Sequence, residues 1–351
     1  MTKRNPAIDI MKGLGILLVI FDHCDPISFE LRRVFMSFMM PMFFFVGGFL
    51  YKSNSDILAD TVKAARRLLL PYAAGVLILG VFTVYLGVVD MWHPLKMLVS
   101  GAGVEHFHCR YWADWVSVGA FWFFPAMFWC RVIFNFLFTR FSRFRYPVLI
   151  TAVVAGYLLL RYVVRLPFGV SEGLSMMLFY LAGHAVRKIK ELYPTIYPEW
   201  QRFVHIVAFV GVTAACFCWL WTIRYSTVVA SAGFYQHSLL NIAGACGIIC
   251  VYYYLCRSFV IYLPKVSRVL CFAGGGSLFL LWIHKLSLHF IFAYPFILHF
   301  QPIETSTAYV TVFLLLQYVF CLLCLMVASQ SSTLRSFFGI YYEAPINNYT
   351  K

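Results

Sequence analysis

Long apolar runs alternate along the chain with short polar connections that are often basic. Ten apolar segments lie at about 7–24, 34–51, 67–89, 117–138, 147–164, 172–187, 203–222, 237–256, 269–294 and 307–329. Most are close to the roughly 20 residues that an α-helix needs to cross a bilayer. The pattern predicts an all-α integral membrane protein with about ten transmembrane helices. No connection is long enough to fold as a soluble domain, so we expect residues 1–351 to form a single membrane domain.

The connections differ in charge between the two sides of this predicted bundle. With the N-terminus placed in the cytoplasm, the inner connections hold 18 Lys and Arg residues and the outer connections hold 7. Cytoplasmic connections of membrane proteins carry an excess of Lys and Arg. The charge bias therefore predicts that both termini are cytoplasmic.

The composition agrees with a membrane protein, since 62% of the residues are hydrophobic and only 12% are charged. The net charge of +14 raises the question of a nucleic-acid partner. However, the basic residues cluster in short connections, which is typical of topology signals and of contact with anionic lipids. We therefore expect membrane lipids, and no nucleic acid, among the partners.

Three groups of residues have side chains of the types that bind metals. They are Glu105-His106-x-His108-Cys109 in a long outer connection, Cys216-x-Cys218 and Cys321-x-x-Cys324. Adjacent residues seldom supply a tetrahedral ligand set on their own, and Cys is a common buried apolar side chain. We therefore expect no metal. Glu105 is kept as a candidate substrate-binding residue because long loops on a helical scaffold often carry binding functions.

A run of small residues, Gly274-Gly275-Gly276-Ser277, precedes the apolar part of the ninth segment. It lacks the Lys that follows the glycines of a phosphate-binding loop. The run predicts either the start of a helix or close packing between helices.

The first segment carries ionisable groups that a spanning helix takes into the membrane. Its uninterrupted apolar run, Gly13 to Phe21, is too short to cross a bilayer, so the helix has to include Lys12 and approach His23. These two residues are eleven positions apart, which places them within about 20° of one helix face and roughly 16 Å apart along the axis. Ionisable groups in such positions are costly and usually mark a functional path.

Six stretches, in this order along the chain, resemble the motifs of a known family. They are IDIMKGLGILLVIFDH, FMSFMMPMFFFVGGFLYK, KAARRLLLPY, GAFWFFPAMF, FYLAGHAVRK and GGGSLFLLWIHK. The first contains a basic residue, ten intervening positions and a histidine, here Lys12 and His23. Together the stretches resemble the membrane-bound acyltransferase 3 family, in particular its sugar O-acetylase branch of fucose 4-O-acetylase-like proteins. Lys12 stands where many members have Arg, and Lys lacks the bidentate fork of a guanidinium group.

The resemblance implies a ten-helix enzyme of the inner (plasma) membrane with cytoplasmic ends. It also implies transfer of an acyl group from a cytoplasmic acyl-CoA, most simply acetyl-CoA, to a hydroxyl of a cell-surface or lipid-linked glycan. Two rival interpretations are a transporter or flippase of a glycan intermediate and an inactive assembly partner. Neither rival requires His23 for the release of CoA.

Transfer of an acyl group to a hydroxyl requires removal of the hydroxyl proton, and His is the side chain best suited to this near neutral pH. His23 is the candidate, either as general base or as a nucleophile that first carries the acyl group. Asp22 is a second catalytic candidate, because a neighbouring carboxylate favours the protonated imidazolium. The alternative for His23 is an interfacial residue that ends a helix.

Lys12, Arg66 and Arg67 lie toward the predicted cytoplasmic side, where their charges suit the phosphates of CoA. The alternative for the two arginines is a topology signal, since juxtamembrane cations occur in any membrane protein. Asp9 is three residues before Lys12 and is expected to pair with it and hold it in place.

Three further residues are candidates for binding the acceptor. His284 and Arg131 are ionisable groups within apolar segments, and Trp122 offers an aromatic face to a sugar ring. The alternatives are helix packing or snorkelling for the two ionisable residues and a membrane-interface role for Trp122.

Overall fold

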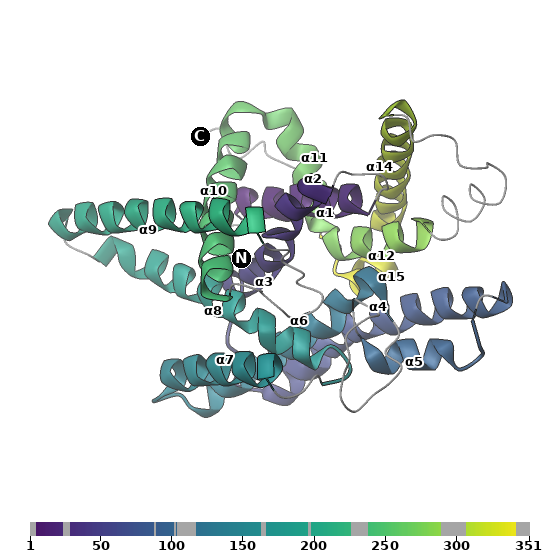
Figure 1. Cartoon of the computed structure of the whole chain (residues 1–351), viewed down its shortest axis with the longest axis horizontal. Helices are drawn as coiled ribbons and strands as arrows, with labels where there is room; N and C mark the ends of the chain where they lie inside the picture. The colour runs from purple at the N-terminus through teal and green to yellow at the C-terminus, as the bar shows by residue number, and fades with distance from the viewer. Residues whose placement is uncertain are drawn as a thin grey trace. The chain divides into compact units, whose positions relative to one another are not determined.

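The computed structural model describes residues 5–23, 29–87, 89–101, 103, 117–162, 166–195, 198–225, 238–288 and 307–341. All regular elements in these ranges are helices (Figure 1), so the predicted all-α architecture is confirmed. In chain order they are α1 (Pro6–Asp22), α2 (Phe29–Met36), α3 (Met39–Phe49), α4 (Ile57–Tyr85), α5 (His93–Ser100), η1 (Gly119–Trp122), α6 (Phe123–Arg140), α7 (Arg145–Tyr162), α8 (Val170–Leu192), η2 (Tyr193–Thr195), α9 (Pro198–Tyr225), α10 (Ser238–Tyr262), α11 (Pro264–Gly275), α12 (Ser277–Ser287), α14 (Thr307–Gln330) and α15 (Ser332–Phe338).

Five helical stretches in the described part of the chain are long and apolar enough to cross a membrane. They lie in α4, in η1 with α6, in α9, in α10 and in α14. The pair α11 and α12 adds a sixth if it is counted as one span, although it bends by 78° at Gly276. Membrane character is therefore confirmed. The number of spanning helices found by length and composition among the described residues is lower than the predicted ten.

Each of the ten predicted segments overlaps at least one helix, and the differences arise at helix ends. Predicted segment 34–51 is divided between α2 and α3 by a turn at residues 37–38. Helix α4 begins ten residues before the predicted segment, because the Asp56 side chain accepts a hydrogen bond from the backbone N–H of Ala59 and caps the helix. Hydropathy alone misses this start, since Asp60, Lys63 and Arg66 interrupt the apolar residues in the first turns of α4.

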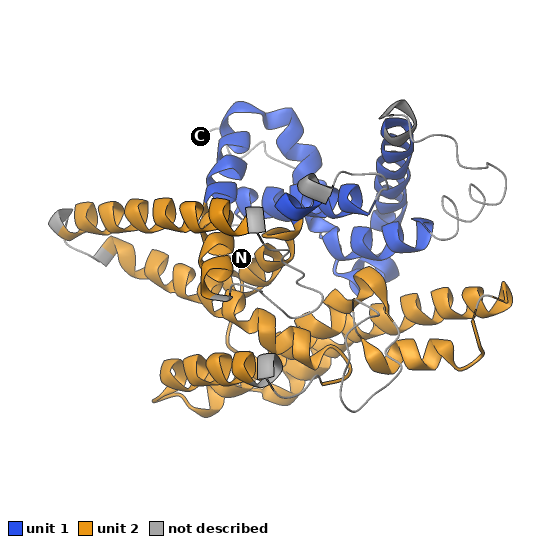
Figure 2. Cartoon of the chain, viewed as in Figure 1, with its two compact units in different colours: residues 1–35, 251–351 blue, residues 36–250 orange. Residues whose placement is uncertain are grey.

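The chain divides into two compact units, coloured separately in Figure 2. Unit 1 contains residues 1–35 and 251–351, so it is assembled from the two ends of the chain, and unit 2 contains residues 36–250. The single membrane domain over residues 1–351 stays a prediction, and each unit is described by itself below.

In unit 1, α1 packs directly against α11 through glycine. A Cβ placed on Gly13 would overlap the backbone carbonyl oxygen of Leu270, and a Cβ on Gly274 would overlap that of Asp9. Small residues at a helix crossing let the backbones approach closely, which is a common way for membrane helices to associate. The predicted packing role of the Gly274–Gly276 run is therefore confirmed for Gly274.

Other helices of unit 1 also hold the backbone of α1. The Tyr318 hydroxyl of α14 donates to the carbonyl of Leu17 at 2.8 Å, and the Tyr252 hydroxyl of α10 lies 3.5 Å from the carbonyl of Met11. These contacts fix the position of the helix that ends at His23.

Unit 2 contains a second crossing of the same kind, between α3 and α8. A Cβ on Gly48 would overlap the carbonyl oxygen of Tyr180, and a Cβ on Gly183 would overlap that of Phe45. Each unit thus contains a close crossing to which both helices contribute a glycine.

Helix α5 lies within the predicted outer connection and packs on α4. The Tyr72 hydroxyl of α4 donates to the carbonyls of Met97 and Leu98, at 3.0 Å each. Before α5, the Asp90 carboxylate accepts a hydrogen bond from the backbone N–H of Trp92, and this bond holds the pKa of Asp90 below its usual value. Local hydrogen bonding therefore orders the start of a connection that hydropathy predicts only as a loop.

Candidate active site

His23 is the residue that ends α1, and its ring is held by its own helix. Nδ1 lies 2.8 Å from the carbonyl oxygen of Val19. Because a carbonyl can only accept, this hydrogen bond assigns the proton of the neutral ring to Nδ1. The lone pair is then on Nε2, the nitrogen that a general base or a nucleophile uses.

The ring of His284, on α12, lies beside the ring of His23. The two ring centroids are 5.3 Å apart, and the ring planes meet at 68°. His284 is fully buried, and its Nδ1 lies 3.1 Å from the carbonyl oxygen of Leu280, so it adopts the same tautomer. Of the sequence-predicted residues in unit 1, these two are brought into direct contact.

Asp22 precedes His23, but its contact is with a cation. Its carboxylate, 4% exposed, lies 3.6 Å from Nε of Arg32 on α2. The negative charge of Asp22 is therefore partly balanced by a guanidinium group, which offsets the cost of burying it.

Lys12 lies earlier on α1, where its ammonium group pairs with Asp9. Nζ and the carboxylate oxygen are 2.7 Å apart, and both side chains are largely shielded from solvent. The pairing expected from the three-residue spacing is confirmed. The ammonium group of Lys12 has three N–H donors, so its pairing with the Asp9 carboxylate does not use all of them.

In unit 2, the predicted CoA-binding residues Arg66 and Arg67 lie within α4. Both side chains are exposed, three turns or less from the capped start of the helix. Their guanidinium groups stand on a regular helix rather than on a flexible connection.

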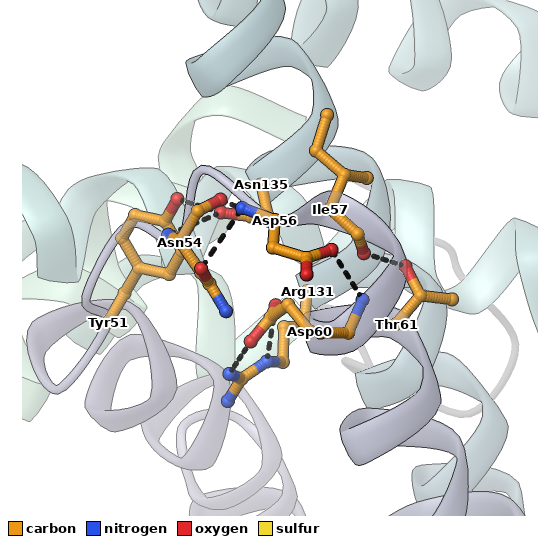
Figure 3. Close-up of polar contacts among 9 residues, drawn as sticks. Tyr51, Asn54, Asp56, Ile57, Asp60, Thr61, Arg131 and Asn135 are labelled. Atoms are coloured by element: carbon orange, nitrogen blue, oxygen red, sulfur yellow. Dashed lines mark hydrogen bonds and ion pairs between the residues drawn. The ribbon is translucent and has the colours of Figure 1, made fainter.

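A buried ion pair joins the start of α4 to α6 (Figure 3). Nη2 of Arg131 lies 2.6 Å and Nε 3.3 Å from the two carboxylate oxygens of Asp60, so the contact is bidentate. The Asp60 side chain is almost fully buried, whereas that of Arg131 is about one-third exposed. Arg131, predicted as an acceptor-binding residue, thus uses two of its donors to hold α4.

The connection between α3 and α4 is fixed by Asn135 of α6 (Figure 3). Its amide oxygen accepts from the Tyr51 hydroxyl at 2.5 Å and from the backbone N–H of Asn54 at 3.3 Å. Its amide nitrogen donates to the carbonyl of Asn54 at 3.3 Å. Sequence reasoning missed this residue, although a lone amide inside an apolar segment is a usable signal.

The remaining predicted residues are placed as follows. Trp122 is 5% exposed, and its ring stacks on Phe44 with the centroids 6.4 Å apart. Glu105 lies outside the described residues. A second residue that sequence reasoning missed is Gln317 of α14, a fully buried amide that contacts the backbone of His284.

A comparison with protein-family models decides the family. The model of an acyltransferase domain, that of acyltransferase 3, matches residues 5–329. The chain belongs to the acyltransferase 3 family. Searches of the curated proteins and of the solved structures found no match for the chain. As a member of this family with apolar helices of spanning length, the chain is a membrane acyltransferase.

Proposed function

We propose that the protein is a membrane O-acetyltransferase that transfers acetyl from acetyl-CoA to a hydroxyl of a cell-surface or lipid-linked glycan. The observation that carries the proposal is the His23 ring at the end of α1, with Nδ1 bonded to Val19 and the lone pair on Nε2. The family supplies the reaction class. The resemblance of the sequence to the sugar O-acetylase branch favours a glycan as the acceptor.

In the proposed mechanism, Nε2 of His23 takes the proton of the acceptor hydroxyl as its oxygen attacks the acyl carbon. The proton then leaves His23 for the departing thiolate sulfur, so the ring returns to its starting tautomer. Asp22 stabilises the transient imidazolium, since opposite charges favour each other. In the other form of the mechanism, Nε2 attacks the acyl carbon and the thioester C–S bond breaks, so the thiolate leaves and His23 carries the acyl group. The hydroxyl oxygen then attacks the same carbon, the C–N bond breaks, and the hydroxyl proton passes to the thiolate.

Acetyl-CoA, when bound, supplies the thioester. The sequence-predicted cations suit its phosphates by charge: Arg66 and Arg67 are exposed guanidinium groups, and Lys12 is an ammonium group paired with Asp9. In this proposal the two arginines bind phosphate, and Asp9 keeps the Lys12 ammonium group in place. The candidate residues for binding the acceptor stay Glu105, Trp122, Arg131 and His284.

The proposal includes a membrane arrangement. We place the protein in the inner (plasma) membrane with about ten spans and both termini in the cytoplasm, which the excess of Lys and Arg in the inner connections supports. In this arrangement the short helix α1 and the broken pair α11 and α12 each count as one span. Short or broken helices are tolerated within the membrane where other helices of the bundle bury them.

The test is thiol release from acetyl-CoA by the purified protein in lipid vesicles, with a crude cell-wall glycan extract as acceptor. We expect the extract to stimulate release by the wild type. His23→Ala should lower the stimulated rate by about 10²-fold or more, the range of general acid–base catalysis. His205→Ala, which alters an exposed histidine of α9, is the matched control and should retain the rate. Equal stimulated rates in wild type and His23→Ala would contradict the proposal.

One observation favours a transporter of a glycan intermediate as the second candidate. The 78° break between α11 and α12 is the kind of interrupted helix that transporters use at their substrate sites. In that case the vesicles would accumulate a labelled glycan without any release of thiol from acetyl-CoA.

A further inference from the structure

A buried polar cluster connects α12 and α14 in unit 1, next to the pair of histidine rings. Its members are His284 and Ser287 of α12 and Gln317 of α14, all of which are buried. Polar groups in the interior of a membrane domain are costly and mark functional positions. The cluster includes one sequence-predicted residue, His284, and two that the sequence does not single out.

Hydrogen bonds within the cluster fix the orientation of the Gln317 amide. Its nitrogen lies 3.2 Å from the carbonyl oxygen of His284 and 2.8 Å from the hydroxyl oxygen of Ser287. The Ser287 hydroxyl in turn donates its proton to the same carbonyl at 3.0 Å. The hydroxyl oxygen of Ser287 and the carbonyl oxygen of His284 can therefore only accept from the Gln317 amide nitrogen. A flipped amide would set its oxygen against a carbonyl oxygen, which is repulsive. The amide oxygen of Gln317 is therefore the atom directed away from these contacts.

Two buried acceptor atoms of the cluster have no hydrogen-bond partner in the described part of the chain. They are Nε2 of His284, whose Nδ1 is bonded to Leu280, and Oε1 of Gln317. Buried polar atoms are nearly always hydrogen-bonded, and exceptions call for an explanation such as a bound ligand. Both atoms accept and neither donates, so the missing partner has to be a donor.

The chemistry of these atoms selects the kind of ligand. Phosphates and carboxylates offer acceptors and are repelled by lone pairs, whereas an ammonium ion is expensive to bring into an apolar interior. A group of three or more His, Cys, Asp and Glu side chains that would hold a metal ion is not found among the described residues. A neutral ligand with more than one hydroxyl supplies donors without charge.

We propose that His284 and Gln317 form the hydroxyl-binding part of the acceptor site, which takes a neutral polyhydroxylated ligand such as a sugar ring. The inference rests on the proposed function and deepens it, since it names the residues that bind the acceptor and the groups that they recognise. The ring of His284 contacts the ring of His23, with the centroids 5.3 Å apart, so a ligand bound by His284 is held in the neighbourhood of His23. His284 thus binds and orients the acceptor, and His23 performs the proton transfer.

The first experiment separates the acceptor KM from the acetyl-CoA KM in the vesicle assay. His284→Phe and Gln317→Met keep the approximate volume but remove the acceptor atoms. Each should raise the KM for the glycan extract at least tenfold and change the KM for acetyl-CoA less than twofold. His284→Gln retains a buried acceptor and should recover part of the loss. A change in stability alone would not divide the two KM values in this way.

The matched control is Cys256→Ala, which alters a fully buried side chain of α10 in the same unit. It should leave both KM values within twofold of the wild type. If His284→Phe or Gln317→Met also left the acceptor KM unchanged, or raised both KM values equally, the inference would be overturned.

A binding measurement distinguishes failure of this inference from failure of the proposed function. Calorimetry with a panel of neutral methyl glycosides should detect binding to the wild type that His284→Phe and Gln317→Met weaken at least tenfold. Binding without any release of thiol would support the hydroxyl site and remove the acyl-transfer proposal. Release of thiol together with glycoside binding that neither variant weakens would support the acyl-transfer proposal and remove the hydroxyl site. If neither thiol release nor glycoside binding were detected, both proposals would be overturned.

Discussion

Gly13 of α1 and Gly274 of α11 lie against each other's helix so closely that neither position has room for a side chain. A Cβ on Gly13 would overlap the carbonyl oxygen of Leu270, and a Cβ on Gly274 would overlap that of Asp9. The helix that carries Lys12 and ends at His23 is held by this contact. The residues proposed for catalysis therefore depend on a crossing that is defined by backbone atoms.

We predict that Gly13→Ala and Gly274→Ala each destabilise the protein. The overlapping atoms belong to the backbone and cannot turn away, so the loss should reach about 1–3 kcal/mol, as for other overpacked sites. The measurement is thermal unfolding in detergent, monitored by the reaction of buried cysteines with a thiol dye. The rate of acetyl transfer should fall together with the stability, because a displaced α1 moves His23.

The control for these variants is Gly211→Ala in α9, where an added Cβ meets no atom within 4 Å. Alanine favours the helix more than glycine does, so this change should leave stability unaltered or slightly increased. A loss at Gly211 as large as at Gly13 would show that the crossing is not the cause.

Much of this architecture is predictable from sequence, because apolar segments and short-range spacing report local structure. The helices follow the apolar segments, and the ion pair of Asp9 and Lys12 follows from their spacing on one helix. The sequence around Gly274 also indicates close packing. These features depend on residues that are near one another along the chain.

Contacts between distant residues are not predictable in this way. Asp60 and Arg131 are 71 positions apart, and Gln317 and His284 are 33 apart. A single sequence shows each of them only as a polar residue in or near an apolar segment. Their partners depend on which helices pack together, and no local pattern encodes that choice.

The buried pair of Asp60 and Arg131 yields the second prediction. Arg131→Gln leaves the buried Asp60 carboxylate without its guanidinium partner, so unfolding free energy should fall by about 2 kcal/mol. This is below the value for fully buried pairs because the Arg131 side chain is about one-third exposed. Denaturant unfolding in detergent measures the change.

The double variant Asp60→Asn with Arg131→Gln should be more stable than Arg131→Gln alone, since it removes the uncompensated charge. Lys188→Gln is the exposed counterpart, because Lys188 and its partner Glu191 are both 43% exposed. It should change stability by less than about 0.5 kcal/mol. If the two single variants had equal effects, burial of the Asp60 carboxylate would not be the cause.

The third prediction concerns the charge of Lys12. Lys12→Gln removes the cation proposed to assist the binding of CoA and should lower kcat/KM for acetyl-CoA at least tenfold, as expected when a charged hydrogen bond is lost. Lys12→Arg keeps the charge and should retain most of the activity. Asp9→Asn leaves the ammonium group present but less well held, so its effect should fall between the two. Wild-type kinetics for Lys12→Gln would remove Lys12 from the mechanism.

The last prediction tests Arg66 and Arg67, whose exposed positions on α4 allow substitution without disturbance of the packing. If they bind the phosphates of CoA, Arg66→Gln and Arg67→Gln should each raise the KM for acetyl-CoA about tenfold and leave kcat and stability nearly unchanged. The wild-type KM should rise with salt, and less steeply in the double variant, because screening weakens exposed charge contacts. Arg202→Gln, at an exposed position of α9, is the control and should have no effect. S-acetyl-pantetheine lacks the nucleotide phosphates, so wild type and both variants should use it equally; a KM difference with this donor would mean that the arginines act on something other than phosphate.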